Sequence, residues 1–143
     1  MTDEQNVDDE IENALVEVPA DEVKVLLESG YLLMEMGKNK EAEEVFSGVC
    51  ALLPQSDVAR VALGNLHFSQ GRIPRALKFH QEALKLQPES SLANAHVGEC
   101  LLMSGKIDQG LSALQKAKNL EPDSAAAAFA QALLEAHEAG ELR

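Results

Sequence analysis

The side chains that could perform metal or nucleophilic chemistry in this sequence are four histidines and two cysteines. The histidines are His67, His80, His96 and His137, and the cysteines are Cys50 and Cys100. Their spacing resembles neither HExxH nor a cysteine–histidine zinc site, and the repeat positions of the first three histidines point in different directions. We therefore expect no metal site, and we interpret the cysteines as reduced thiols in the core.

Other catalytic patterns are equally weak. No glycine loop follows a predicted strand as a phosphate-binding loop does, and no Ser or Cys lies in a nucleophile elbow. Paired carboxylates such as Glu43 and Glu44 lie on a helix face that we expect to be exposed, where they increase solubility. The sequence therefore predicts that the protein has no catalytic residues and no cofactor, and that it is not an enzyme.

The composition limits the partners. The chain has 143 residues, with 24 acidic and 12 basic side chains and a net charge of -12. This charge argues against binding to nucleic acid or to anionic membrane surfaces. No apolar run reaches the roughly 18 to 20 residues that span a bilayer. The N-terminal stretch 1–22 is rich in acids and contains no base, unlike a secretory signal peptide.

The elements that position these side chains form a repeat. Prolines recur at positions 54, 88 and 122, and glycines recur at 30, 64 and 98 and again at 37, 71 and 105. In each series the position number rises by 34 at every step, which is the period of the tetratricopeptide repeat (TPR). The first glycine series allows two helices to approach closely, and the second ends the first helix of each repeat in a left-handed conformation.

The period predicts an all-α fold. Three helix-turn-helix repeats cover residues 23–56, 57–90 and 91–124. We predict first helices at 22–36, 57–70 and 91–104 and second helices at 39–53, 73–87 and 107–120, with Asp57 as an N-cap. Ser124 begins a C-terminal capping helix at 125–139, within a last segment of 125–143. Residues 1–22 form an acidic N-terminal arm with a short amphipathic helix, in which Ile11, Leu15 and Val18 are candidates for dimerisation.

Function should then depend on a surface. Stacked TPRs form a superhelix whose concave face is lined by the first helices, and a large exposed apolar patch marks a binding site. The charged clamp with which some TPR domains hold the terminal carboxylate of heat-shock chaperones is missing, because its positions carry Leu27, Tyr31, Ala62, Leu92 and His96. We predict instead an apolar peptide-binding groove, in which Asn65 bonds the peptide backbone. Its residues are Leu27, Tyr31, Met34, Val58, Val61, Asn65, Phe68, Leu92, His96, Glu99, Leu102 and Met103.

Two segments resemble a known family. The stretch from His96 to Gly105 reads HVGECLLMSG and is similar to the HxAECLLxxG segment of the class II (LcrH/SycD-like) chaperones of bacterial type III secretion. The run from Gly37 through Ala42 and Phe46 to Cys50 is similar to the GxxxxAxxVFxxLC run of the same family. The resemblance extends over roughly residues 23–140.

The resemblance implies a function. Chaperones of this class are small, acidic, non-catalytic proteins of the bacterial cytoplasm. They bind an extended segment of a hydrophobic translocator in the concave groove and keep this client soluble before export, and many are homodimers formed through N-terminal helices. This chain departs from the family in its shorter N-terminal region and in Met34 and Ala95, which replace groove aromatics. A generic TPR scaffold or assembly adaptor and a needle-subunit chaperone remain alternatives.

Overall fold

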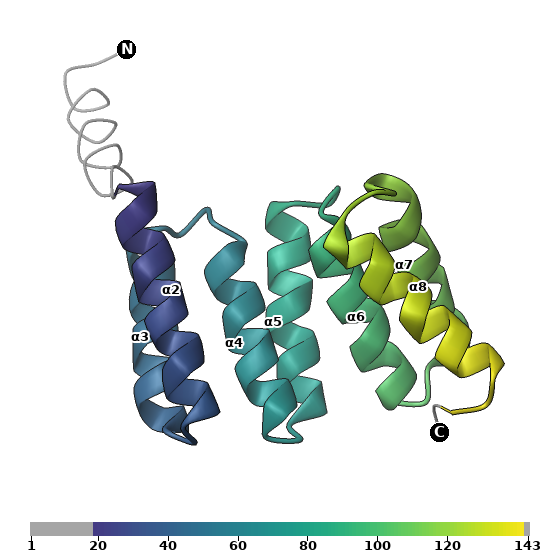
Figure 1. Ribbon diagram of the computed structural model, residues 1–143, viewed down its shortest axis with the longest axis horizontal. Coiled ribbons are helices and arrows are strands. Elements are labelled where there is room, and N and C mark those ends of the chain that lie inside the picture. The colour runs from purple at the N-terminus through teal and green to yellow at the C-terminus, as the bar shows by residue number, and fades with distance from the viewer. Residues whose placement is uncertain (1–18, 142–143) are drawn as a thin grey trace, which may run out of the picture.

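The protein is described by a computed structural model that covers residues 19–141, and within this range it contains helices and no strand. The helices are α2 (Ala20–Glu35), α3 (Asn39–Leu52), α4 (Val58–Ser69), α5 (Ile73–Leu86), α6 (Ser91–Met103), α7 (Ile107–Leu120) and α8 (Ala125–Glu138). Figure 1 shows them stacked as an array, with the hairpin of α2 and α3 at one end and α7 and α8 at the other. The predicted all-α fold of stacked helical hairpins with a C-terminal helix is confirmed. The predicted short N-terminal helix lies outside the described residues.

The backbone itself repeats with the period of the sequence. Gly37, Gly71 and Gly105 have φ angles of 77°, 75° and 80°, a left-handed conformation that glycine adopts without a steric penalty. Each of these glycines follows the first helix of a repeat and reverses the chain into the second helix. The three hairpins therefore share one turn geometry, which is the physical origin of the glycine period in the sequence.

The other glycine series allows the two helices of a hairpin to pack closely. In each repeat a large side chain of the second helix fills the space over a glycine of the first. A Cβ atom on any of these glycines would come closer than 3.0 Å to that side chain, so only glycine fits. The three pairs are Gly30 with Phe46, Gly64 with His80 and Gly98 with Leu114.

The helix N-termini differ in how they are capped. The Ala93 amide donates a hydrogen bond to Ser90 Oγ over 3.1 Å, and the Ala127 amide donates to Ser124 Oγ over 3.0 Å. The prediction for Ser124 is confirmed. Asp57 occupies the predicted N-cap position of α4, but its side chain makes no capping bond. Asp57 has helical angles (φ -77°, ψ -27°), whereas a capping residue needs an extended backbone to turn its side chain onto the free amides.

The core consists of small clusters between neighbouring hairpins. Phe46 and Leu66 are fully buried in the first cluster, and Leu114 is fully buried in the last. Alanines occupy much of the remaining buried surface, which allows the helices to lie close together. Because each hairpin packs only on its neighbours, the first helices α2, α4, α6 and α8 lie in series and form one continuous face.

Candidate functional site

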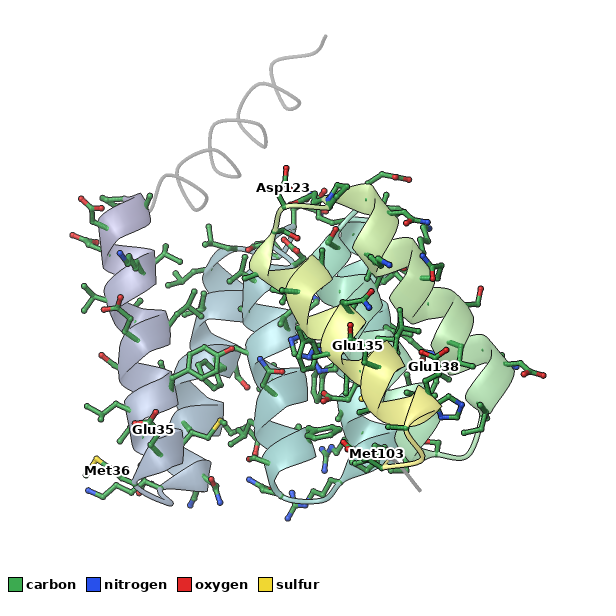
Figure 2. All side chains as sticks on the ribbon, turned by 45° about the vertical axis from the view of Figure 1, so that its right-hand side comes forward. Glu35, Met36, Met103, Asp123, Glu135 and Glu138 are labelled. Carbon is green, nitrogen blue, oxygen red and sulfur yellow. The ribbon has the colours of Figure 1, made fainter. Side chains whose placement is uncertain are left out.

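The inner face is the surface formed by the first helices, on which the predicted groove residues lie. Three of these residues are large, apolar and well exposed: Val58 (47 %), Leu92 (41 %) and Met103 (53 %). Val58 begins α4, Leu92 is the second residue of α6, and Met103 ends α6. Figure 2 shows Met103 and Glu35, the last residues of α6 and α2, toward the same end of the molecule. The exposed apolar side chains of the inner face therefore come from two adjacent repeats.

Four further predicted groove residues are only half-buried. Leu27, Tyr31 and Met34 pack against the first core cluster and still reach the surface, and Phe68 has intermediate exposure. The Tyr31 ring meets the Phe46 ring edge-on, with 5.1 Å between their centroids. These side chains thus support the fold and contribute to the surface at the same time.

Two predicted groove residues belong to the core. Val61 is 2 % exposed and packs with Ala83 and Ala93, and Leu102 is 8 % exposed and packs with Leu114. Leu102 also lies under Gly110, at which a Cβ atom would come within 2.9 Å of it. The prediction that these two side chains line the groove is therefore corrected: small residues of the second helices, Ala83 for Val61 and Gly110 for Leu102, admit them to the core.

A hydrogen bond joins the first two repeats across the inner face. The Asn65 side-chain amide donates to Tyr31 Oη over 2.9 Å, and both residues hold the same position in successive repeats. Burial raises the pKa of Tyr31 above its usual 10.0, with the Asn65 hydrogen bond opposing this shift. The phenol therefore keeps its proton at neutral pH, and its O–H remains a donor for a further acceptor.

At the third repeat the inner face carries a histidine and a carboxylate. His96 Nδ1 lies 3.7 Å from Glu99 Oε1, and both side chains are mostly buried. The His96 ring stacks on the His80 ring with 4.7 Å between centroids, and it contacts Phe129 of α8 with a centroid distance of 5.4 Å. The expectation that the histidines point in different directions is wrong for His80 and His96, because α5 and α6 bring their rings together.

The buried histidines are core residues. His80 is 1 % exposed, and burial together with the neighbouring His96 lowers its pKa from 6.5 to about 3. His67 is fully buried and stacks on Phe79 with a centroid distance of 5.3 Å, and burial lowers its pKa as well. Within residues 19–141 no group of three His, Cys, Asp or Glu side chains is arranged to hold a metal ion.

The thiols are also protected. Cys100 is fully buried, and desolvation with nearby Glu99 raises its pKa to about 12. Cys50 is partly buried, and desolvation raises its pKa too. Because the thiolate is the nucleophile, the raised pKa of both thiols lowers their reactivity at neutral pH.

Sequence reasoning missed two features. The first is Phe129 and Leu133 of α8, which follow Ala95 and Glu99 by one repeat period and pack against the last core cluster beside His96. Extending the period by one more helix finds them, so α8 continues the inner face as well as capping the core. The second is an apolar end face on α2 and α3, with Val25, Leu26, Leu32, Met36 and Leu52 exposed. Ile11, Leu15 and Val18, the candidates for dimerisation, lie outside the described residues.

Comparison with known proteins places these features in a family. The profile of the family described as Anaphase-promoting complex, cyclosome, subunit 3 matches residues 35–117, more than half of the chain. The curated proteins give no match. In the described part of the chain, no helix is both long and apolar enough to cross a membrane.

Solved structures match over most of their length. The type III secretion translocator chaperone SycD of Yersinia enterocolitica is 22 % identical, with a TM-score of 0.74 over 86 % of this chain and 95 % of SycD. PcrH of Pseudomonas aeruginosa is 26 % identical, with a TM-score of 0.71 over 85 % of this chain and 96 % of PcrH. PcrH in complex with the chaperone binding region of PopD is 26 % identical, with a TM-score of 0.70 over 87 % of this chain and 97 % of PcrH. The chain therefore belongs to the tetratricopeptide-repeat family described as Anaphase-promoting complex, cyclosome, subunit 3, and it has the fold of the translocator chaperone SycD.

Proposed function

We propose that this protein is a non-catalytic type III secretion chaperone of the bacterial cytoplasm. It binds an extended apolar segment of a secreted translocator on its inner face and keeps this client soluble before export. The observation that carries the proposal is the exposure of Val58, Leu92 and Met103 on the inner face of a fold that PcrH also has in its complex with the PopD chaperone binding region.

Exposed apolar side chains that gather on one surface mark interaction sites, whereas single ones are normal. The large exposed apolar residues of the described chain fall on only two surfaces, the inner face and the end face. The inner face has the better composition for binding a peptide, because Tyr31, Asn65 and Glu99 add polar contacts among the apolar ones. Such a mixture fixes the orientation of a bound peptide, while the apolar contacts supply most of the affinity.

The protein acts as a chaperone by burying apolar surface of its client. A segment that inserts into membranes aggregates in water, and covering it gains about 25 cal/mol per Å² of apolar surface without ATP. The net charge of -12 then keeps the complex soluble by mutual repulsion. We infer that the protein works by holding its client and releasing it to the export machinery, with no chemical step.

Affinity purification from the native host tests the proposal. We expect mass spectrometry to find a secreted protein with membrane-inserting segments bound to the wild type. A variant with Val58→Ser, Leu92→Ser and Met103→Ser should lose this partner, whereas Val25→Ser, Leu32→Ser and Met36→Ser on the end face should retain it. Recovery of only soluble cytosolic proteins, or the same client with both triple variants, would instead identify a scaffold or a different binding surface.

A further inference from the structure

The convex side of the second repeat has an unusual charge. Although the chain carries twice as many acids as bases, α5 and the residue before it contain four bases and one acid. The bases are Arg72, Arg75, Lys78 and Lys85, all of them exposed, and the acid is Glu82. Arg75, Lys78, Glu82 and Lys85 are spaced by three or four residues, so they lie along one face of the helix. We name the four bases the α5 basic stripe.

Two bases of the stripe, Arg75 and Lys78, have no basic counterpart in the other repeats, whereas Arg72 corresponds to Lys38 and Lys106. One period earlier, Arg75 and Lys78 correspond to Glu41 and Glu44 of α3, and one period later they correspond to Gln109 and Ser112 of α7. The repeat architecture therefore does not require Arg75 and Lys78. None of the four forms an ion pair within 4.0 Å among residues 19–141, so their charge is not neutralised by the described part of the fold.

The sequence contains one segment of complementary charge. Residues 1–18, which lie outside the described structure, contain seven acids and no base. The acids are Asp3, Glu4, Asp8, Asp9, Glu10, Glu12 and Glu17. We propose that this acidic segment docks on the α5 basic stripe of its own chain.

The geometry of the fold permits this contact. The start of α2, to which the segment is attached, and the end of α5, which carries Lys85, lie at the same end of the molecule (Figure 1). α2 packs on α4, and α4 packs on α5, so the two helices are two packing steps apart, about 20 Å at 8–10 Å a step. Glu12 is seven residues from Pro19 and can reach about 23–25 Å from it when extended.

Because the acidic segment is attached to the chain, the α5 basic stripe binds it in preference to separate acidic partners. A tethered segment has an effective concentration in the millimolar range, so weak ion pairs suffice to hold it.

Zero-length carbodiimide cross-linking of the full chain tests the proposal, since this reagent joins a carboxylate to a lysine amine only when the two are in contact. Mixed light and heavy isotope-labelled chains separate links within a chain from links between chains. We expect links from Asp3–Glu12 to Lys78 and Lys85 to exceed those to Lys106 and Lys116 by at least about threefold. The same links should fall by a similar factor in 0.5 M NaCl, where the Debye length is only about 4 Å.

A pair of charge variants provides the control. Arg72→Gln with Arg75→Gln keeps both reactive lysines but weakens the stripe, so the yield of these links should fall by about half or more. Lys116→Gln with Lys118→Gln removes two charges from α7 and should leave the yield unchanged. Links spread evenly over exposed lysines, or found mainly between light and heavy chains, would overturn the proposal. An equal yield in the arginine variant would overturn it as well.

Discussion

At the scale of single residues, the stacking depends on a contact between a glycine and a large side chain. Gly64 lies under the His80 ring, and neither can move away because both are buried in the helix hairpin. We predict that Gly64→Ala lowers the free energy of unfolding by about 1–3 kcal/mol, because the added methyl group forces the helices apart. Urea denaturation followed by circular dichroism measures this loss.

Gly48 is the matched control for Gly64. It lies within α3 and has no heavy atom within 4 Å of the position of an added Cβ. Gly48→Ala should therefore leave the protein unchanged or stabilise it by up to about 1 kcal/mol through helix propensity. Equal losses in the two variants would contradict the assignment of Gly64 to a close helix contact.

His80 makes the stability of the fold dependent on pH. Its pKa is about 3 in the folded protein and near 6.5 when unfolded, so below pH 6.5 the unfolded chain binds more protons. The stability that the neutral, buried His80 contributes to the fold is fully present above about pH 6.5. As the pH falls toward 3 this stability is lost, and the free energy of unfolding decreases by up to about 1.4 kcal/mol per pH unit. Leu114 holds the same position in the third repeat, so His80→Leu should fold and should lose less stability than the wild type between pH 7 and pH 4.5. Urea midpoints that fall by the same amount in the two proteins between pH 7 and pH 4.5 would contradict the prediction.

The positions of the repeated glycines are predictable from the sequence, but the burial of each side chain between them is not. Local backbone geometry requires glycine at the turns, so these glycines recur with the repeat period and are recognisable in the sequence. The prediction that Val61 and Leu102 line the groove assumes that the position within a repeat alone fixes the direction of a side chain. Their burial depends on small residues in the facing helix, such as Ala83 for Val61, which single-helix periodicity does not encode.

At the scale of helices, capping distinguishes otherwise similar N-termini. Ser124 accepts a hydrogen bond from the Ala127 amide, whereas Asp57 makes no such bond. We predict that Ser124→Ala costs about 1 kcal/mol and Asp57→Ala less than about 0.5 kcal/mol. Thermal unfolding of both variants measures the difference, and a larger loss for Asp57→Ala would contradict the capping geometry described above.

The helix order is predictable from sequence, but the role of the last helix is not. The period places a helix after Ser124, and α8 begins at Ala125. Its composition, with three consecutive alanines after Ala125, indicates only a cap. The contact between Phe129 and His96 depends on the packing of α8 against α6, which requires the tertiary structure.

At the scale of the whole molecule, the N-terminal arm remains a candidate for self-association. Val25 and Leu32 of α2 and Met36 just after it form an exposed apolar row, and Val25 lies closest to the point at which the arm joins α2. We predict that deletion of residues 1–18 preserves the helicity of the remaining chain, because every described core cluster lies beyond them. It should also lower the oligomeric mass through the loss of Ile11, Leu15 and Val18. Light scattering and circular dichroism measure both quantities, and global unfolding of the truncated chain would reject the prediction.

The proposed function depends on the binding of an apolar peptide to the inner face. The most direct test compares the affinities of matched surface variants for one peptide. The probe is the apolar segment of the client recovered by affinity purification, labelled for fluorescence anisotropy. We predict saturable binding that changes little with salt, because apolar contacts dominate. The variant with Val58→Ser, Leu92→Ser and Met103→Ser should bind at least about tenfold more weakly, while Val25→Ser, Leu32→Ser and Met36→Ser should bind within about twofold of the wild type. No binding to the wild type, or equal losses in both variants, would contradict the claim.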